Sequence, residues 1–443
     1  MSTLTLVIIT VFVVGYICIA TESLLKINKA AIALLMCVFC WTLLMMAPGS
    51  FYPNVAPDGL IGHISEVIEH HLGDAAGTLF FLMGAMTIVE IVDSNGGFNF
   101  VRDALKTRSK RKLMWRVAFM TFFLSAILDN LTTSIVMIMV LRKLVQSRSE
   151  RLIYAALIVI AANSGGAFSP IGDVTTIMLW IKGVITTQGV LTEIFIPSLV
   201  SMVIPAFILQ YSLNGKFDKS QNLPKAEVTQ FTKVQRDIIF WLGVGGLVFV
   251  PIFKTITHLP PFMGILLVLG ILWTVTEIFH HNTSEDDTMA KRVSDLLSRI
   301  DLSTIMFFLG ILMAVAVLQE IGVLTRLGEG LNETFNGNHY LVTGIIGVLS
   351  SIVDNVPLVA GCMGMYPVQP TGDMAVDGIF WQLLAYCAGV GSSMLIIGSA
   401  AGVVVMGLEK ITFGWYMKKI TWIAFVGYLA GILVYWLERT FIF

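Results

Sequence analysis

An acidic residue lies in the middle of the apolar stretch SAILDNLTTSIVMI, residues 125–138. A carboxylate in such a segment costs free energy unless it is neutralised, so it usually has a function. Carboxylate, amide and hydroxyl oxygens are hard ligands, which suit a small hard cation. The stretch therefore predicts a site for a monovalent cation or a proton, with these candidate ligands: Asp129, Asn130, Ser125 one helical turn earlier, Thr132 and Thr133.

Polar residues also interrupt three other apolar stretches, NSGGAFSPIGDVTT at 163–176, SSIVDN at 350–355 and GVGSS at 389–393. The candidate ligands in them are Asn163, Asp173, Thr175, Thr176, Ser350, Ser351, Asp354, Asn355, Ser392 and Ser393. No Lys or Arg lies in the apolar stretches around Asp129 and Asp354. We therefore expect these acids to lack a basic partner and to be neutralised by a metal ion or a proton.

Several of these residues also have a purely structural interpretation. Asn163 and the pair Thr175 and Thr176 could cap the ends of a broken helix. The serines could donate back to the preceding helical turn. The sequence leaves both interpretations open at these positions.

The elements around these residues are long apolar segments. The 443-residue chain is 56% hydrophobic and 13% charged, against roughly 25% charged residues in soluble domains. This composition predicts an all-α polytopic membrane protein in a lipid bilayer. The net charge of −1 gives no indication of nucleic-acid binding. Segments near the spanning length lie at 4–20, 29–47, 74–93, 190–212, 236–253, 261–279, 302–321 and 420–438.

Basic residues predict the topology, because Lys and Arg concentrate in cytoplasmic loops. The loop at 48–73 has no Lys or Arg, whereas 94–116 is rich in both. This alternation places the N-terminus outside the cell and 94–116 inside. Both flanks of 113–145 are basic, so we expect this segment to be a re-entrant helical hairpin with DNLTT at its tip.

Three more segments do not resemble simple spans. A second hairpin is expected at about 339–366, with flanks that are almost free of basic residues, so it should enter from outside. Glycine and polar residues interrupt the helices expected at 152–181 and 381–407. Unwound backbone at that depth occurs only where protein buries it or where it lines a wet cavity.

An internal repeat is visible at a separation of 225–227 residues. The matched pairs are FFLMGAM (80–86) with FFLGILM (307–313), LSAILDNLTT (124–133) with LSSIVDNVPL (349–358), and AANSGGAFSPIG (161–172) with CAGVGSSMLIIG (387–398). Ordered self-similarity of this kind indicates a duplicated unit. Each unit has five expected crossings, an odd number, so the second should be inverted, as in secondary transporters. The expected domains are a first repeat at 1–213, a cytoplasmic linker at 214–235 and a second repeat at 236–443.

The two repeats differ in their candidate ligands. Asp173 of the first aligns with Ser399 of the second, and the Thr175–Thr176 pair aligns with Ala401 and Gly402. We therefore expect the main Na⁺ site in the first repeat, at Asp129, Asn130 and Asp173. Burial and like-charge proximity both disfavour an ionised carboxylate. Each acid should then hold either a cation or a proton, and competition at one site is enough for exchange.

The segments LFFLMGAMTIVEIVD, SAILDNLTTSIVM, NSGGAFSPIGDVTTIMLW and SSIVDNVPLV resemble NhaD-type sodium/proton antiporters of the ion transporter superfamily. The resemblance extends over nearly the whole chain. It implies exchange of Na⁺ or Li⁺ for H⁺ across a bacterial inner membrane, without a cofactor, by a homodimer. It also implies an elevator-like movement of the hairpins and broken helices against a scaffold, for which we predict 4–47 and 236–279.

Two other functions are open at this stage. The same fold could serve a sodium-coupled dicarboxylate carrier or an efflux permease for an oxyanion such as arsenite. Dicarboxylate carriers of the superfamily have Ser-Asn-Thr at the hairpin tips, whereas this chain has Asp129-Asn130 and Asp354-Asn355, whose carboxylates would repel an anion. A membrane enzyme is disfavoured, because the paired acids have no nucleophile near them.

Overall fold

The computed structural model describes residues 3–98, 101, 104–213, 215–217, 231–281 and 293–442. Within these residues the secondary structure is helical, with no strand and a single isolated bridge between Ser109 and Lys216. The prediction of an all-α polytopic membrane protein is confirmed. The expected linker at 214–235 lies outside the described residues except for 215–217 and 231–235.

In this part of the chain, seven helical segments are long and apolar enough to cross a membrane. They are α3 (Lys29–Met46), α4 (Leu60–Ser94) with the preceding η2 (Pro57–Gly59), α10 (Thr187–Glu193) with α11 (Phe195–Leu209) and η3 (Gln210–Ser212), α12 (Lys233–Thr257), α13 (Pro261–His281), α15 (Leu302–Glu320) and α22 (Thr421–Phe441). Other elements are α1 (Thr3–Ala20), α2 (Glu22–Leu25), η1 (Pro48–Ser50), α14 (Val293–Leu297), α16 (Val323–Thr334) and α21 (Phe413–Lys419).

The segment expected as a loop without Lys or Arg at 48–73 is mostly helix, which corrects the sequence-based prediction. Helix α4 begins at Leu60 and continues without a break to Ser94. Its polar first half still has a packed face, because Leu60 and Ile64 are buried and the His71 ring contacts Glu320 at 2.8 Å. The charges of this segment indicated solvent contact, which a half-exposed helix also provides.

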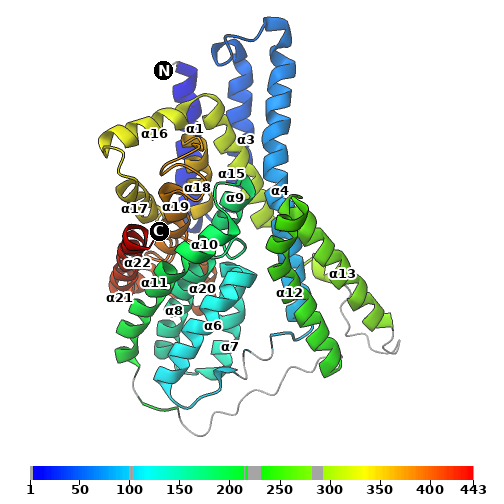
Figure 1. Cartoon of the computed structure of the whole chain (residues 1–443), viewed down its shortest axis with the longest axis vertical. Helices are drawn as coiled ribbons and strands as arrows, with labels where there is room; N and C mark the ends of the chain where they lie inside the picture. Colours follow the sequence, from blue (N-terminus) through cyan, green and yellow to red (C-terminus); the bar gives the residue numbers. More distant parts are fainter. Residues whose placement is uncertain are drawn as a thin grey trace.

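Two helix pairs meet at the acidic tips. Helix α6 (Lys110–Leu128) and α7 (Asn130–Leu144) join at Asp129, and α17 (His339–Ser350) and α18 (Asn355–Met365) join through residues 351–354. In Figure 1, α6 and α7 lie in the lower part of the molecule, whereas α17 and α18 lie in the upper part. The two tips therefore approach the middle of the molecule from different ends.

Two interrupted helices form the centre of the molecule (Figure 1). They are α8 (Arg148–Ala167) followed by α9 (Val174–Lys182), and α19 (Ile379–Gly391) followed by α20 (Ala400–Glu409). Every residue of α8 from Tyr154 onwards is buried, and so is every residue of α19 after Ile379. Their inner ends consist of small residues, so the hairpin backbones can approach closely.

Glycines at matching positions permit this close approach. A Cβ atom on Gly165 of α8 would overlap the backbone carbonyl oxygen of Phe122 in α6. A Cβ atom on Gly391 of α19 would overlap the carbonyl oxygen of Gly347 in α17 in the same way. These positions need glycine, because backbone atoms cannot move aside as a side chain can.

The other helices surround these four pairs. Helix α3 packs against α1 and α15, α4 packs against α12, α13 and α15, and α11 packs against α22 and α8. In Figure 1, α3, α4, α12 and α13 occupy the right side of the molecule, beside the hairpins and interrupted helices. Of the segments predicted as a scaffold, α1 packs against α3 and α12 packs against α13. Residues of α1 and of the second interrupted helix line one cavity, so a single separate scaffold stays a prediction.

Candidate functional site

Asp129 occupies the point where α6 stops and α7 begins. Its backbone has φ 78° and ψ 161°, a region that is occupied almost only by glycine. One oxygen of its half-buried carboxylate accepts a hydrogen bond from the Thr132 backbone N–H at 2.8 Å, and the other accepts from the Thr132 hydroxyl at 3.0 Å. Each carboxylate oxygen has a further lone pair, so the group can still coordinate a cation.

Asn130 begins a line of buried polar contacts through the centre of the molecule. Its side-chain N–H donates to the side-chain amide oxygen of Asn163 at 3.1 Å. The Asn163 N–H group in turn donates to the hydroxyls of Ser393 and Ser399, both at 3.0 Å. Asn163 is fully buried, so it connects the first hairpin tip to the second interrupted helix.

Asp173 caps the N-terminus of α9 and is 1% exposed. One of its oxygens accepts from the Thr175 backbone N–H at 3.4 Å, and the other accepts from the Asn355 side chain at 3.3 Å. A Cβ atom on Gly389 would lie 3.4 Å from that second oxygen. The carboxylate therefore projects from the first interrupted helix towards the second hairpin tip and α19.

The predicted threonines differ in their contacts. Thr176 donates to the backbone carbonyls of Asp173 at 2.9 Å and Gly166 at 3.3 Å, which is a structural role. Thr133 and the adjacent Ser134 have buried hydroxyl oxygens without a hydrogen-bond partner among the described residues. Unsatisfied buried polar atoms are rare in folded proteins, and these two lie in the first turns of α7, just after Asp129 and Asn130.

The predicted serines mostly make structural hydrogen bonds. Ser125 donates to the Ala162 carbonyl at 2.6 Å, and Ser350 donates to the Ala388 carbonyl at 2.7 Å. Each of these bonds joins a hairpin to its neighbouring interrupted helix. Ser351 and Ser392 donate back to the preceding turn of their own helices. Of the predicted serines, Ser393 is the one that accepts from Asn163.

Asp354 does have a basic partner, which corrects the expectation that both tip acids are unpaired. The Lys29 ammonium lies 2.9 Å from one Asp354 oxygen, and the other oxygen accepts from the Val356 backbone N–H at 3.3 Å. Lys29 is 325 residues away in the chain and begins α3. Inspection of the residues around the tip could not find it, because the contact is created by tertiary packing.

Ser399 also contacts the site, although it was not among the residues predicted from the sequence. This residue caps α20, and its hydroxyl accepts from Asn163. A signal was available, because Ser399 aligns with Asp173 between the two repeats. Both aligned residues cap the helix that follows the break.

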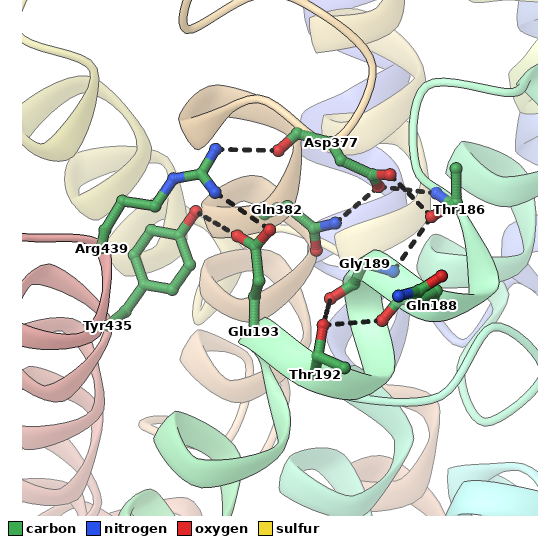
Figure 2. A network of polar contacts seen from close by, with 9 residues as sticks. All are labelled: Thr186, Gln188, Gly189, Thr192, Glu193, Asp377, Gln382, Tyr435 and Arg439. Atoms are coloured by element: carbon green, nitrogen blue, oxygen red, sulfur yellow. Dashed lines mark hydrogen bonds and ion pairs between the residues drawn. The ribbon is translucent and has the colours of Figure 1, made fainter. Parts of the chain in front are cut away.

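A separate polar network lies near the C-terminal end of α22 and was not predicted (Figure 2). The Asp377 carboxylate accepts from the backbone N–H and hydroxyl of Thr186 and from the Gln382 side chain. Arg439 pairs with Glu193 at 3.0 Å and donates to the Asp377 carbonyl. The network joins the start of α10 to α19 and α22, and its acids have partners, which is the arrangement of a structural brace.

The fold and this site together define a class, the polytopic membrane transporters with helical hairpins and interrupted helices. A solved structure with the same fold is the YdaH transporter of Alcanivorax borkumensis, with a TM-score of 0.63 and 12% identity, covering 92% of this chain and 98% of that one. The match at this identity concerns the fold alone.

Sequence comparisons define the family. The CitMHS family, described as citrate transporter, matches residues 16–384. The chain is 45% identical to sodium/proton antiporter 1 of Arabidopsis thaliana, over 96% of this chain and 71% of the relative. It is 31% identical to the Na⁺/H⁺ antiporter NhaD of Alkalimonas amylolytica, over 98% of this chain and 90% of the relative. The chain belongs to the CitMHS family and, within it, to the NhaD-type sodium/proton antiporters.

The relatives include plant as well as bacterial proteins. Sodium/proton antiporter 2 of Arabidopsis thaliana is 40% identical over 96% of this chain and 97% of its own length. The apolar helices and the family together show a multi-pass membrane transporter. Because the relatives come from plants as well as bacteria, a bacterial inner membrane stays a prediction, and so does the external N-terminus.

Proposed function

We propose that this protein exchanges Na⁺ or Li⁺ for H⁺ across its membrane, using Asp129 and Asp173 as the exchanging groups. The observation that supports this most directly is the surroundings of the two carboxylates. Both contact backbone N–H, amide or hydroxyl groups, and neither forms an ion pair among the described residues. A small cation or a proton is then the neutralising group.

Competition between the two ions is the proposed mechanism. A cation bound at a carboxylate excludes a proton from the same oxygen, and protonation removes the charge that attracts the cation. Asn130 and Asn163 keep their amides in a buried hydrogen-bonded line, which orients the first tip towards the interrupted helices. The free hydroxyl oxygens of Thr133 and Ser134 are available as additional ligands.

The movement that exposes the site to each side is proposed to be of the elevator type. The hairpins and interrupted helices would move together against α1, α3, α12 and α13. The two proposed inverted repeats are supported by their matched contacts, in which Ser125 and Ser350 each bond the neighbouring interrupted helix. A homodimer in a bacterial inner membrane, with the N-terminus outside, completes the proposal.

The description of the CitMHS family as citrate transporter favours a second candidate, a sodium-coupled carrier of a carboxylate anion. The buried acids at the site argue against it, since Asp173 is 1% exposed and would repel an anion nearby. Uptake of labelled citrate into vesicles, with and without a Na⁺ gradient, decides between the two.

Everted membrane vesicles from a host without its own sodium/proton antiporters test the exchange. Addition of Na⁺ or Li⁺ should dequench a dye that reports the pH gradient. The Asp129→Asn variant should abolish this response, because the amide retains an oxygen to cap α7 and removes only the charge. Asp58→Asn, at an exposed residue of η2, is the matched control and should respond normally. A normal response from Asp129→Asn would overturn the site assignment.

A further inference from the structure

Lys29 is held at the start of α3 by three groups. Its ammonium lies 2.9 Å from Asp354 and 4.2 Å from the centre of the Phe307 ring, a cation–π distance. Its backbone N–H donates to the Glu22 carboxylate at 3.1 Å. The side chains of Lys29 and Asp354 are 24% and 17% exposed. These contacts hold Lys29 against the second hairpin tip in this conformation.

The pair joins two parts of the protein that the proposed elevator would separate. Lys29 belongs to α3, which is part of the predicted scaffold, and Asp354 belongs to the second hairpin tip. The next residue along the tip, Asn355, donates to the Asp173 carboxylate at 3.3 Å. Lys29 is thus connected to Asp173 through the adjacent residues Asp354 and Asn355.

The two hairpin tips differ in the groups that contact their carboxylates. The Asp129 carboxylate is bonded to the backbone N–H and hydroxyl of Thr132, which are neutral groups. The Asp354 carboxylate is bonded to an ammonium. A cation supplied by the protein occupies the place at the second tip that a transported cation would need.

A small cavity of about 80 Å³ lies beside the pair. Its polar lining comes from Tyr16, Glu22 and Ser399 as well as from the pair itself. Ser399 also accepts the hydrogen bond from Asn163. Space for water or a small cation therefore lies next to Asp354, and Ser399 belongs both to this cavity and to the line of polar contacts through Asn163.

We propose that Lys29 is a tethered counter-cation for Asp354, so that the protein itself neutralises the second hairpin tip and leaves Asp129 and Asp173 to exchange Na⁺ and H⁺. Lys29 is in this role a positioning residue. It fixes Asp354, and through the adjacent Asn355 it fixes a hydrogen bond to Asp173. The inference rests on the proposed exchange function and revises the expectation that Asp354 is itself a cation ligand.

Three variants test the charge balance in the everted-vesicle assay, with the half-saturating Na⁺ concentration as the readout. Lys29→Gln leaves an extra negative charge near Asp173, so half-saturation should move to lower Na⁺ concentration. Asp354→Asn leaves an unpaired ammonium, so half-saturation should move to higher concentration. Each shift should be on the order of tenfold for one uncompensated charge in a partly buried site. The double variant Lys29→Gln with Asp354→Asn should lie within a few-fold of the wild type.

A purely structural role would not produce shifts of opposite sign, and this distinguishes the two roles. Lys29→Arg retains the charge and should stay near the wild type. An Asp354→Asn loss of exchange that persists in the double variant would show that Asp354 is a cargo ligand, which overturns the inference. So would unchanged half-saturation in Lys29→Gln. If the single variants do not accumulate, Lys29→Arg and the double variant still test the inference. Half-saturating Na⁺ concentrations near that of the wild type would support it, and a loss of exchange in the double variant would contradict it. Absence of Na⁺-dependent exchange in the wild type would instead contradict the proposed function.

Discussion

Substitution of Asp173 by asparagine separates the charge of this residue from its shape. The carboxylate makes two contacts, from the Thr175 backbone N–H at 3.4 Å and from the Asn355 amide at 3.3 Å. An asparagine has one oxygen, so it can accept only one of these bonds in either orientation of its amide. The loss of one hydrogen bond to a charged group costs about 1.5–3 kcal/mol of stability. Part of this cost is offset, because burying a neutral amide costs less free energy than burying an ionised carboxylate.

The effect on ion binding should be much larger. A unit charge about 4 Å from a cation contributes roughly 4 kcal/mol at an effective dielectric constant of 20. Since about 1.4 kcal/mol corresponds to a tenfold change in affinity, Asp173→Asn should weaken Na⁺ binding by about a thousandfold. The melting temperature in detergent should change little, whereas Na⁺-induced dequenching in everted vesicles should disappear at any practical Na⁺ concentration.

A compensating variant sharpens this test. In Asp173→Asn combined with Asn355→Asp, the amide and the carboxylate exchange places, and the hydrogen bond between them is restored. Exchange should return in part, at Na⁺ concentrations at which Asp173→Asn shows none, because a charge is restored to the same site. A wild-type half-saturation in Asp173→Asn, in protein that is correctly inserted, would refute the assignment of Asp173 as an exchanging group.

Two further predictions concern the packing around the site. Gly165→Ala should destabilise the protein by about 1–3 kcal/mol, because the new methyl group would overlap the Phe122 carbonyl oxygen. A lower melting temperature in detergent checks this prediction. The control is Gly270→Ala, where a Cβ atom meets nothing within 4 Å, and it should leave the melting temperature unchanged. Glu409→Gln should cost roughly 1–3 kcal/mol, because it removes the shared partner of two arginines that also contact solvent. Melting with and without 1 M salt measures this second effect, and a variant as stable as the wild type would show that the ion pairs contribute nothing.

Local patterns were sufficient to predict the class and the helix ends at which Asp129 and Asp173 lie. Composition indicated a membrane protein, and interrupted apolar stretches indicated helix ends at Asp129 and Asp173, where the structure has them. These features depend on neighbouring residues, since an acid or a glycine at membrane depth disturbs its own helix. The pairing of Asn130 with Asn163 was not predicted as a contact, but both residues were among the candidates.

Contacts between distant parts of the chain could not be predicted in this way. The ion pair of Lys29 with Asp354 depends on how α3 packs against the second hairpin tip, and the residue types alone do not determine this. The brace of Glu193 with Arg439 also joins separate helices. A charged residue in a sequence is assumed to contact solvent. This assumption fails for residues such as Lys29, whose ion-pair partner is distant in the chain.

The backbone at Asp129 has an evolutionary consequence. Glycine adopts φ 78° and ψ 161° without steric cost, whereas a residue with a Cβ atom sacrifices about 1–3 kcal/mol there. Selection for thermal stability alone should therefore replace this aspartate with glycine. A lineage that retains the acid must be under selection to keep its side chain. A homologue with glycine at this position should be more stable and should not exchange ions.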